Sequence, residues 1–192
     1  FNMKRLLLIL ILTFSFQTLT NADDISDFKI EGVSIGDSLL DFASEEKIKS
    51  IKAIDQYPND KFIIYIVDKL IKTTRYSQLS VTTKKNDKKY IVSSLSGSIY
   101  FENLNECLKN KKQIRSDVEK LINYDDFEKT KYKSQDGKST IHGLQFYLKP
   151  YPSVEAIVLN CEQYLKSGKD IRLSIAVNPE KYAYFLINEA YK

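Results

Sequence analysis

The chain has 192 residues, of which 43% are apolar and 28% charged, and its net charge at pH 7 is +4. This composition is typical of a globular protein, and it excludes a fibrous or a largely disordered chain. The length suffices to bury one sizeable core, so we expect one folded domain.

The first residues have the pattern of a secretory signal peptide. Lys4 and Arg5 follow Met3, residues 6–16 are apolar, and Ala22 offers a small side chain at the cleavage position. We predict that residues 1–22 are the leader, with Phe1 and Asn2 upstream of the start at Met3, and that residues 23–192 form the exported domain, which is periplasmic or extracellular. The apolar run is shorter than the ~20 residues that span a bilayer, so we expect no membrane span in the mature form; an uncleaved anchor is the alternative.

The loss of the leader also changes the charge balance. Without Lys4 and Arg5 the net charge falls from +4 to +2. So small a net charge does not indicate a polyanionic partner. We therefore expect no nucleic acid, and a partner in the envelope or outside the cell whose identity the sequence does not give.

Two helix starts follow the leader. Ser38, or its neighbour Asp37, is a suitable N-cap for a helix over residues 39–54, and Asp41 three residues past Ser38 completes a capping-box pattern. Ser44, followed by two glutamates, is a second start signal. The region is therefore either one kinked helix or two short ones.

Three runs rich in β-branched and aromatic residues come next, after a turn at residues 57–60. We predict antiparallel strands for them. The runs cover residues 61–67, 76–83 and 88–95. Gly97 then predicts a bend or bulge before a short strand at residues 99–101.

The longest helical pattern lies at the centre of the chain, over residues 103–122. Asn103, with Glu106 three residues later, supplies a start signal. Lys111 and Arg115 fall within the apolar stripe, where their stems can lie along apolar surface with the charges in water. The apolar residues recur at steps of three and four, as one face of a helix requires: Leu104, Cys107, Leu108, Ile114, Val118, Leu121 and Ile122.

A hairpin is predicted after this helix, with strands at residues 127–134 and 139–148 around the turn Asp136-Gly137. In its second strand His142, Leu144, Phe146 and Leu148 share one face.

Two more strands, at residues 154–161 and 171–177, precede the last element. The end of the chain reads as a cap at Asn178, Pro179 at the first helical position and a helix over residues 181–191. Strands grouped in runs, with helices between the runs, predict an α+β fold. We expect a largely antiparallel sheet packed by the central amphipathic helix, with an N-terminal helical segment and a short C-terminal helix.

The two cysteines, Cys107 and Cys161, form a natural disulfide pair in an exported chain. Such a bond would join the central helix to a strand. Two buried free thiols are the alternative, since Cys107 also fits the apolar stripe.

Gly36-Asp37-Ser38-Leu39 resembles the motif of the GDSL esterases and lipases. The resemblance covers four residues and implies a Ser38 nucleophile activated by a histidine, here His142. Ser139 stands where that family has the aspartate three residues before its histidine, and the glycine and asparagine segments of its oxyanion hole have no match. Since nucleophilic catalysis needs these groups together, a serine ester hydrolase is our alternative and a helix cap our preferred interpretation.

The remaining polar residues give no pattern for a metal or cofactor. His142 fits a half-buried strand position, and one histidine with two cysteines cannot assemble a zinc site. No carboxylates have calcium-loop spacing, and no glycine-rich phosphate loop occurs. We expect no cofactor.

Lysines alternate at Lys129, Lys131 and Lys133 along one predicted strand, and further lysines flank the turn after residue 83. Such clusters can contact phosphates, but edge strands also use lysine to prevent pairing between sheets. We favour the second interpretation.

A resemblance extends over most of the chain after the leader. It is to a group of small exported proteins from AT-rich marine bacteria, and it is carried by KIEGVSIGDSLLDF, KKYIVSSLSGSIYFENLNECLKNKKQI and RLSIAVNPEKYAYFLI. The resemblance implies export and a shared fold, and it implies no activity. The sequence thus leads us to expect an exported, non-catalytic binding or envelope-associated protein.

Overall fold

The computed structural model describes residues 24–54, 57–134, 137–164 and 171–192. One sheet of eight strands dominates it, in the order β1-β2-β3-β4-β8-β7-β6-β5, and every neighbouring pair is antiparallel. The strands are β1 (Ala53–Ile54), β2 (Phe62–Ile66), β3 (Gln78–Lys84), β4 (Val92–Phe101), β5 (Asp126–Lys133), β6 (Ser139–Tyr147), β7 (Ala156–Tyr164) and β8 (Ile171–Asn178). The predicted α+β fold with an antiparallel sheet is confirmed.

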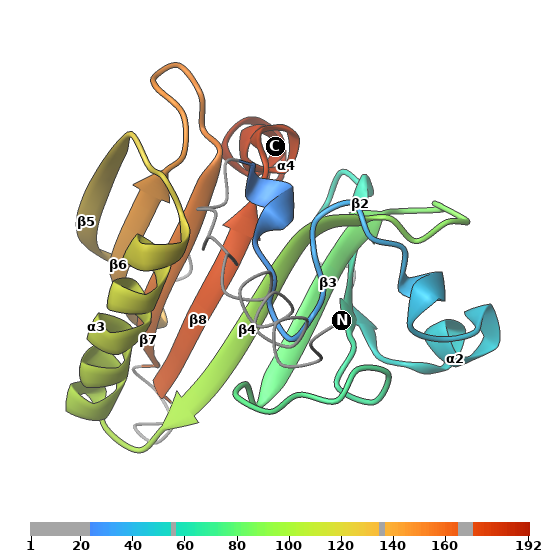
Figure 1. The fold of residues 1–192 in the computed structure, drawn as a ribbon, viewed down its shortest axis with the longest axis horizontal. Coiled ribbons are helices and arrows are strands. Elements are labelled where there is room, and N and C mark those ends of the chain that lie inside the picture. The colour runs from blue at the N-terminus through green and yellow to red at the C-terminus, as the bar shows by residue number, and fades with distance from the viewer. Residues whose placement is uncertain (1–23, 55–56, 135–136, 165–170) are drawn as a thin grey trace, which may run out of the picture.

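The sheet consists of two groups of four strands that follow one another in the chain (Figure 1). The groups join where β4 pairs with β8, from Leu95 opposite Val177 to Phe101 opposite Ile171. The helix α3 (Leu104–Leu121) connects the groups. β5, which carries the alternating lysines, is an edge strand of the sheet.

The helix α3 packs on one face of the sheet, over β7 and β8 and against the end of β4. It begins as predicted, because the side chain of Asn103 accepts a hydrogen bond of 2.9 Å from the amide of Glu106. Its inward residues Cys107, Ile114 and Val118 are buried, while Leu121 lies largely in solvent.

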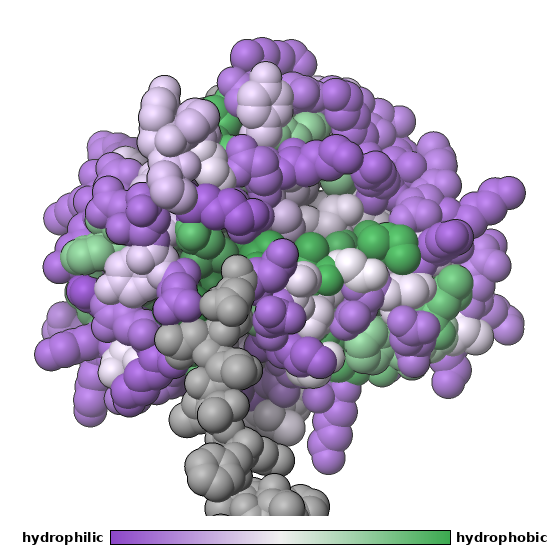
Figure 2. Space-filling view, turned by 45° about the horizontal axis from the view of Figure 1, so that its top comes forward, coloured by the Kyte–Doolittle hydropathy of each residue, from purple (hydrophilic) through white to green (hydrophobic). Residues whose placement is uncertain are grey.

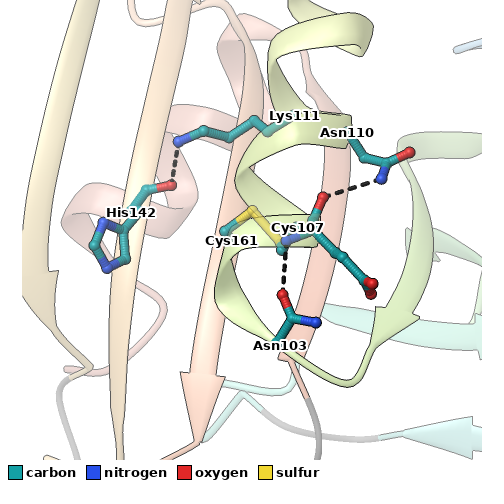
Figure 3. Close-up of a disulfide and its surroundings, with 7 residues drawn as sticks. Asn103, Cys107, Asn110, Lys111, His142 and Cys161 are labelled. Carbon is teal, nitrogen blue, oxygen red and sulfur yellow. Dashed lines mark hydrogen bonds between the residues drawn. A yellow bond between two sulfur atoms is a disulfide. The ribbon is translucent and has the colours of Figure 1, made fainter.

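The predicted cysteine pair joins this helix to β7 (Figure 3). The sulfur atoms of Cys107 and Cys161 are 2.05 Å apart, a disulfide distance, and the Cα atoms are 6.0 Å apart. Neither residue is exposed to solvent. The bond therefore lies inside the core, between the helix and the sheet.

The N-terminal segment covers the rest of the same face. It holds the 3₁₀ turns η1 (Ile25–Asp27) and η2 (Leu39–Asp41) and the helix α2 (Glu45–Ser50). Two short elements thus form where either one kinked helix or two were expected. Ser38 and Ser44 cap them, and a capping box joins Ser38 to Asp41.

The helix α4 (Glu180–Asn188) begins one residue earlier than predicted, and its cap differs. Pro179 is the N-cap and makes no side-chain cap bond, so the prediction of a cap at Asn178 was wrong. Asn178 ends β8 instead, and its Oδ1 accepts a hydrogen bond of 2.9 Å from Ser94 Oγ. This hydrogen bond joins residues that are 84 positions apart, so a local sequence pattern could not predict it.

Gly97 also differs from the prediction. No break occurs there, since β4 runs through as one strand of ten residues. The glycine makes room for a ring: a Cβ at this position would lie 2.6 Å from Cδ1 of Tyr76. The register shift in this strand pair lies elsewhere, between Thr82 and Thr83.

The hairpin between β5 and β6 forms as predicted, with Gly137 at a φ of 67°. Asp136 of its turn lies outside the described residues, as do the predicted leader and residues 165–170. The described helices include none long and apolar enough to cross a bilayer. The surface in Figure 2 is mostly hydrophilic, with a band of hydrophobic residues across the middle of the view.

Candidate functional site

The face of the sheet opposite α3 carries small polar side chains where a second layer would need apolar ones. Side chains alternate along a strand, so Leu95 and Gly97 of β4 face the core while Ser94, Ser96 and Ser98 face the other way. The strands beside β4 repeat the pattern. The polar residues on this face of β3, β8 and β7 are Gln78, Ser80, Thr82, Arg172, Ser174, Asn178 and Asn160. Apolar residues of the same lining are Ala176 of β8, Ile64 and Ile66 of β2, and Ile54 of β1.

The strand register gathers these residues into one floor. Ser80 is paired with Ser96, and Ser98 lies between Gln78 on β3 and Ser174 on β8. Because most of these side chains are short, the floor is hollowed, and the hollow has a volume of about 390 Å³. We call it the serine hollow.

The helix α4 and the segment before β2 close one end of the serine hollow with Tyr57, Tyr182, Leu186 and Tyr191. The hydroxyl groups of Tyr57 and Tyr182 are 2.6 Å apart and hydrogen-bonded. Burial raises the pKa of the Tyr182 hydroxyl, so the pair is neutral over the physiological range. This end therefore offers aromatic surface without charge.

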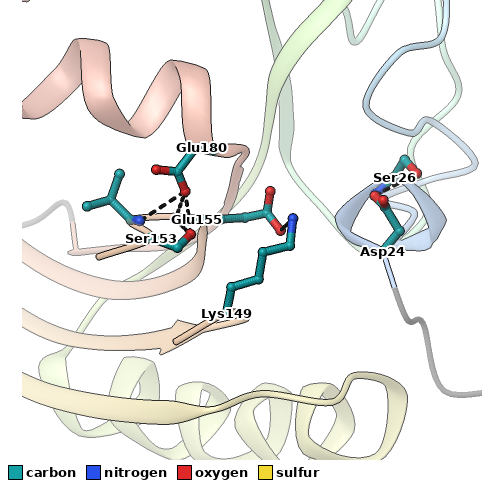
Figure 4. A network of polar contacts seen from close by, with 7 residues as sticks. Asp24, Ser26, Lys149, Ser153, Glu155 and Glu180 are labelled. Atoms are coloured by element: carbon teal, nitrogen blue, oxygen red, sulfur yellow. Dashed lines mark hydrogen bonds and ion pairs between the residues drawn. The ribbon is translucent and has the colours of Figure 1, made fainter. Parts of the chain in front are cut away.

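A carboxylate at its first turn holds α4 in place (Figure 4). Glu180 accepts hydrogen bonds from the Ser153 hydroxyl, from the amide of Val154 at 3.0 Å and from the amide of Glu155 at 3.2 Å. These bonds, the Ser153 hydroxyl first, lower the pKa of the Glu180 carboxyl. Beside them the buried Glu155 carboxylate pairs with Lys149 at 3.0 Å.

Charge at the far end of the hollow is nearly cancelled. The guanidinium of Arg172 lies 2.5 Å from Glu162 Oε2, and Glu162 Oε1 accepts a hydrogen bond of 2.7 Å from Ser139. Nε of Arg172 is buried and has no hydrogen-bond partner among the described residues. A buried donor without a partner costs free energy.

The lining of the serine hollow suits hydrogen bonding. Among the described residues that line it there is no histidine, cysteine, lysine or carboxylate that could activate a serine hydroxyl. Hydroxyl and amide groups both donate and accept, so the floor can match a neutral polar ligand.

The structure does not bring together the two residues of the esterase alternative. Ser38 is the N-cap of η2 and pairs in an isolated bridge with Ile91, the residue before β4. His142 lies in β6, and β8 and β7 separate β4 from β6. The Ser38 hydroxyl accepts the amide of Leu40 at 3.1 Å and donates to the carbonyl of Lys89 at 2.5 Å. Its oxygen is therefore engaged in holding a turn.

No group of three or more histidine, cysteine, aspartate or glutamate side chains that could hold a metal ion occurs in the described part of the chain. Comparisons of the chain with protein-family models, with curated proteins and with solved structures found no match.

Sequence reasoning missed the serine hollow. The signal was present in SSLSGS at residues 93–98 and in LSIAVN at residues 173–178, where small polar residues alternate with apolar ones. Alternation of this kind predicts a half-exposed strand. The pairing of β4 with β8, 70 or more residues apart in the chain, was needed to place the two sets side by side.

Proposed function

We propose that the protein is an exported, non-catalytic binding protein that acts in the periplasm or outside the cell. The serine hollow is its binding site, and the ligand is small, neutral and rich in hydroxyl or amide groups, such as a mono- or disaccharide. The observation that carries the proposal is a concave sheet face lined by neutral hydrogen-bonding side chains and closed at one end by tyrosines.

Size and charge support this class of ligand. A volume of about 390 Å³ falls in the range of roughly 300–1,000 Å³ that is usual for small-molecule pockets. A charged ligand would need an unpaired counter-charge, but Arg172 is already paired with Glu162. A neutral ligand leaves that ion pair undisturbed.

The first test is native mass spectrometry of the protein recovered from its own compartment, compared with the Ser96→Leu variant. Leucine at this half-buried floor position fills the hollow, so we expect a bound small molecule to be lost. Ser50→Leu is the matched control, because Ser50 is exposed at the end of α2, outside the hollow. A molecule retained equally by both variants would place the binding site elsewhere.

A second test adds glucose, N-acetylglucosamine and maltose to the protein and follows backbone amide signals by NMR. We expect at least one sugar to shift the amides of β3, β4 and β8, in the wild type and in Ser50→Leu but not in Ser96→Leu. Shifts spread evenly over the chain would contradict a site in the hollow.

The export proposal has its own measurement. N-terminal sequencing of the mature protein should give a start at or within a few residues of Asp23. A soluble cytoplasmic protein that retains Met3 would contradict the proposal.

A further inference from the structure

A second pocket, of about 260 Å³, lies on the opposite side of the sheet, where α3 meets β5 and β6. Its polar lining is almost entirely cationic. Lys111, Lys112 and Arg115 come from the helix, Lys129 from β5 and His142 from β6. We call it the cationic pocket, and it shares none of its lining residues with the serine hollow.

The helix and the strands build this pocket together. Lys111 and Arg115 are four residues apart, so they lie on the same side of α3. The stem of Lys111 reaches from α3 toward the sheet, and its Nζ donates a hydrogen bond of 2.6 Å to the backbone carbonyl of His142 (Figure 3). Lys129 approaches from the edge strand, with its Nζ 5.8 Å from the centroid of the Phe127 ring.

The described residues balance only part of the positive charge of the pocket. Arg115 pairs with Glu119 at 2.7 Å. For Lys111, Lys112 and Lys129, by contrast, the described residues provide no ion pair. The residues opposite His142 on the neighbouring strands add no negative charge. Lys131 on β5 is a further cation, and Cys161 on β7 is disulfide-bonded.

Neighbouring lysines contribute, after burial, to the lowered pKa values of two groups in the pocket. Burial, with a further contribution from Lys129, lowers the pKa of the Lys111 ammonium. Burial, followed by the charges of Lys131 and Lys111, lowers the pKa of the His142 imidazole. A negative charge in the pocket would reverse the electrostatic part of both effects.

We propose that the cationic pocket binds a tetrahedral oxyanion, a phosphate or sulfate group, either free or as part of a larger molecule. Three ammonium groups without carboxylate partners suit a doubly charged anion better than a single carboxylate. The ammonium of Lys111 is already directed by its bond to the carbonyl of His142, so it has two further N–H donors for the anion.

The single histidine of the chain provides a specific probe for this site. The experiment follows the imidazole signals of His142 by NMR through a pH titration in sodium sulfate and in sodium chloride of equal ionic strength. Sulfate stays doubly charged throughout the titration, so the change in signal belongs to the protein. We expect the pKa of His142 to be higher in sulfate by about one unit. Equal values in the two salts would overturn the proposal.

Variants separate a site from general screening by salt. Lys129→Gln removes an exposed charge of the pocket, and we expect it to weaken sulfate binding several-fold. Lys133→Gln, on the same face of the same strand but outside the pocket, is the matched control and should bind as the wild type does. An equal loss in both variants would show non-specific attraction and would also overturn the proposal.

Two further arms distinguish the source of the anion. Inorganic phosphate that competes with sulfate shows that the free ion suffices. Glucose 6-phosphate that competes more strongly than inorganic phosphate shows that the group is recognised as part of a larger molecule. Competition by neither of them would contradict a site for tetrahedral oxyanions. None of these outcomes depends on ligand binding in the serine hollow.

Discussion

Ser38 caps η2 and joins it to the segment before β4 through both functions of its hydroxyl, as acceptor for the Leu40 amide and as donor to the Lys89 carbonyl. Loss of such a cap costs about 1 kcal/mol of unfolding free energy. We therefore expect Ser38→Ala to lower the unfolding free energy by about that amount in urea denaturation. Ser38→Asp should recover part of it, because aspartate accepts the amide hydrogen bond but cannot donate to the carbonyl.

Ser93→Ala is the control for this prediction, since the hydroxyl of Ser93 makes one long hydrogen bond of 3.5 Å and should matter little. The same proteins test the hydrolase alternative. We expect none of them to hydrolyse short-chain aryl esters above background. Serine-dependent turnover in the wild type, lost in Ser38→Ala with its stability unchanged, would contradict the capping role.

Gly97 gives a prediction of packing at a single residue. Gly97→Ala places a methyl group within 2.6 to 2.9 Å of three ring carbons of Tyr76. Overpacking of this kind costs about 1–3 kcal/mol, which urea denaturation measures directly. In a Tyr76→Ala background the ring is gone, so the additional cost of Gly97→Ala should largely disappear. An unchanged cost in that background would assign the effect to the strand backbone instead.

Single residues were predictable where their partner is close in sequence. The caps at Ser38, Ser44 and Asn103 each satisfy an amide two or three residues ahead, so a local pattern contains both partners. Gly97 and Asn178 were misread because their partners, Tyr76 and Ser94, come from other parts of the chain. The limit of prediction at this scale is the sequence distance between partners.

Between elements, Glu180 holds the start of α4 to the segment before β7, and its stabilising effect depends on pH. Its pKa in the folded protein lies below the ordinary 4.5. Its contribution is therefore complete above the pKa of the unfolded chain and is lost as pH falls through the lower folded pKa. We expect Glu180→Gln to cost up to about 1 kcal/mol near pH 7, reduced by solvent screening, and this difference to shrink as the pH falls below 4.5.

Thermal unfolding of wild type and variant at pH 7, 5 and 3 measures this effect. Glu102→Gln, an exposed residue in the loop before α3, should change stability little at each pH. A difference between wild type and Glu180→Gln that grows toward low pH would have the wrong sign for a carboxylate with a lowered pKa.

The disulfide joins α3 to β7 covalently, and its two cysteines are 54 residues apart in the chain. Cross-linking a loop of this size restricts the unfolded chain by about 4 kcal/mol. We expect urea denaturation with and without reductant to differ by about that amount. The double variant Cys107→Ala, Cys161→Ala should be insensitive to reductant, which separates the effect of the bond from any other action of the reagent.

Whole elements were predictable because their patterns are strong. The period of α3, the hairpin around Gly137 and the runs of β-branched residues each identify their element, and all of them form. The serine hollow was not predictable in this way. Its floor combines residues of β3, β4, β7 and β8. Serine at alternate positions of one strand indicates only a face that is not buried, and the strand order is needed to place such faces side by side.

At the scale of the molecule, the two faces of one sheet carry different chemistry. The face under α3 holds the apolar core and, at its edge, the cationic pocket, whereas the other face holds the neutral serine hollow. Strand alternation separates the two sites by the thickness of one sheet. We therefore expect sulfate and a neutral sugar to bind to the same molecule at the same time.

The pairing of β4 with β8 also determines when the molecule can finish folding. During synthesis β4 is complete 77 residues before β8 is, and its open edge has no β8 partner until then. An unpaired strand edge invites pairing with other chains, so a chain delayed at this stage is prone to aggregate.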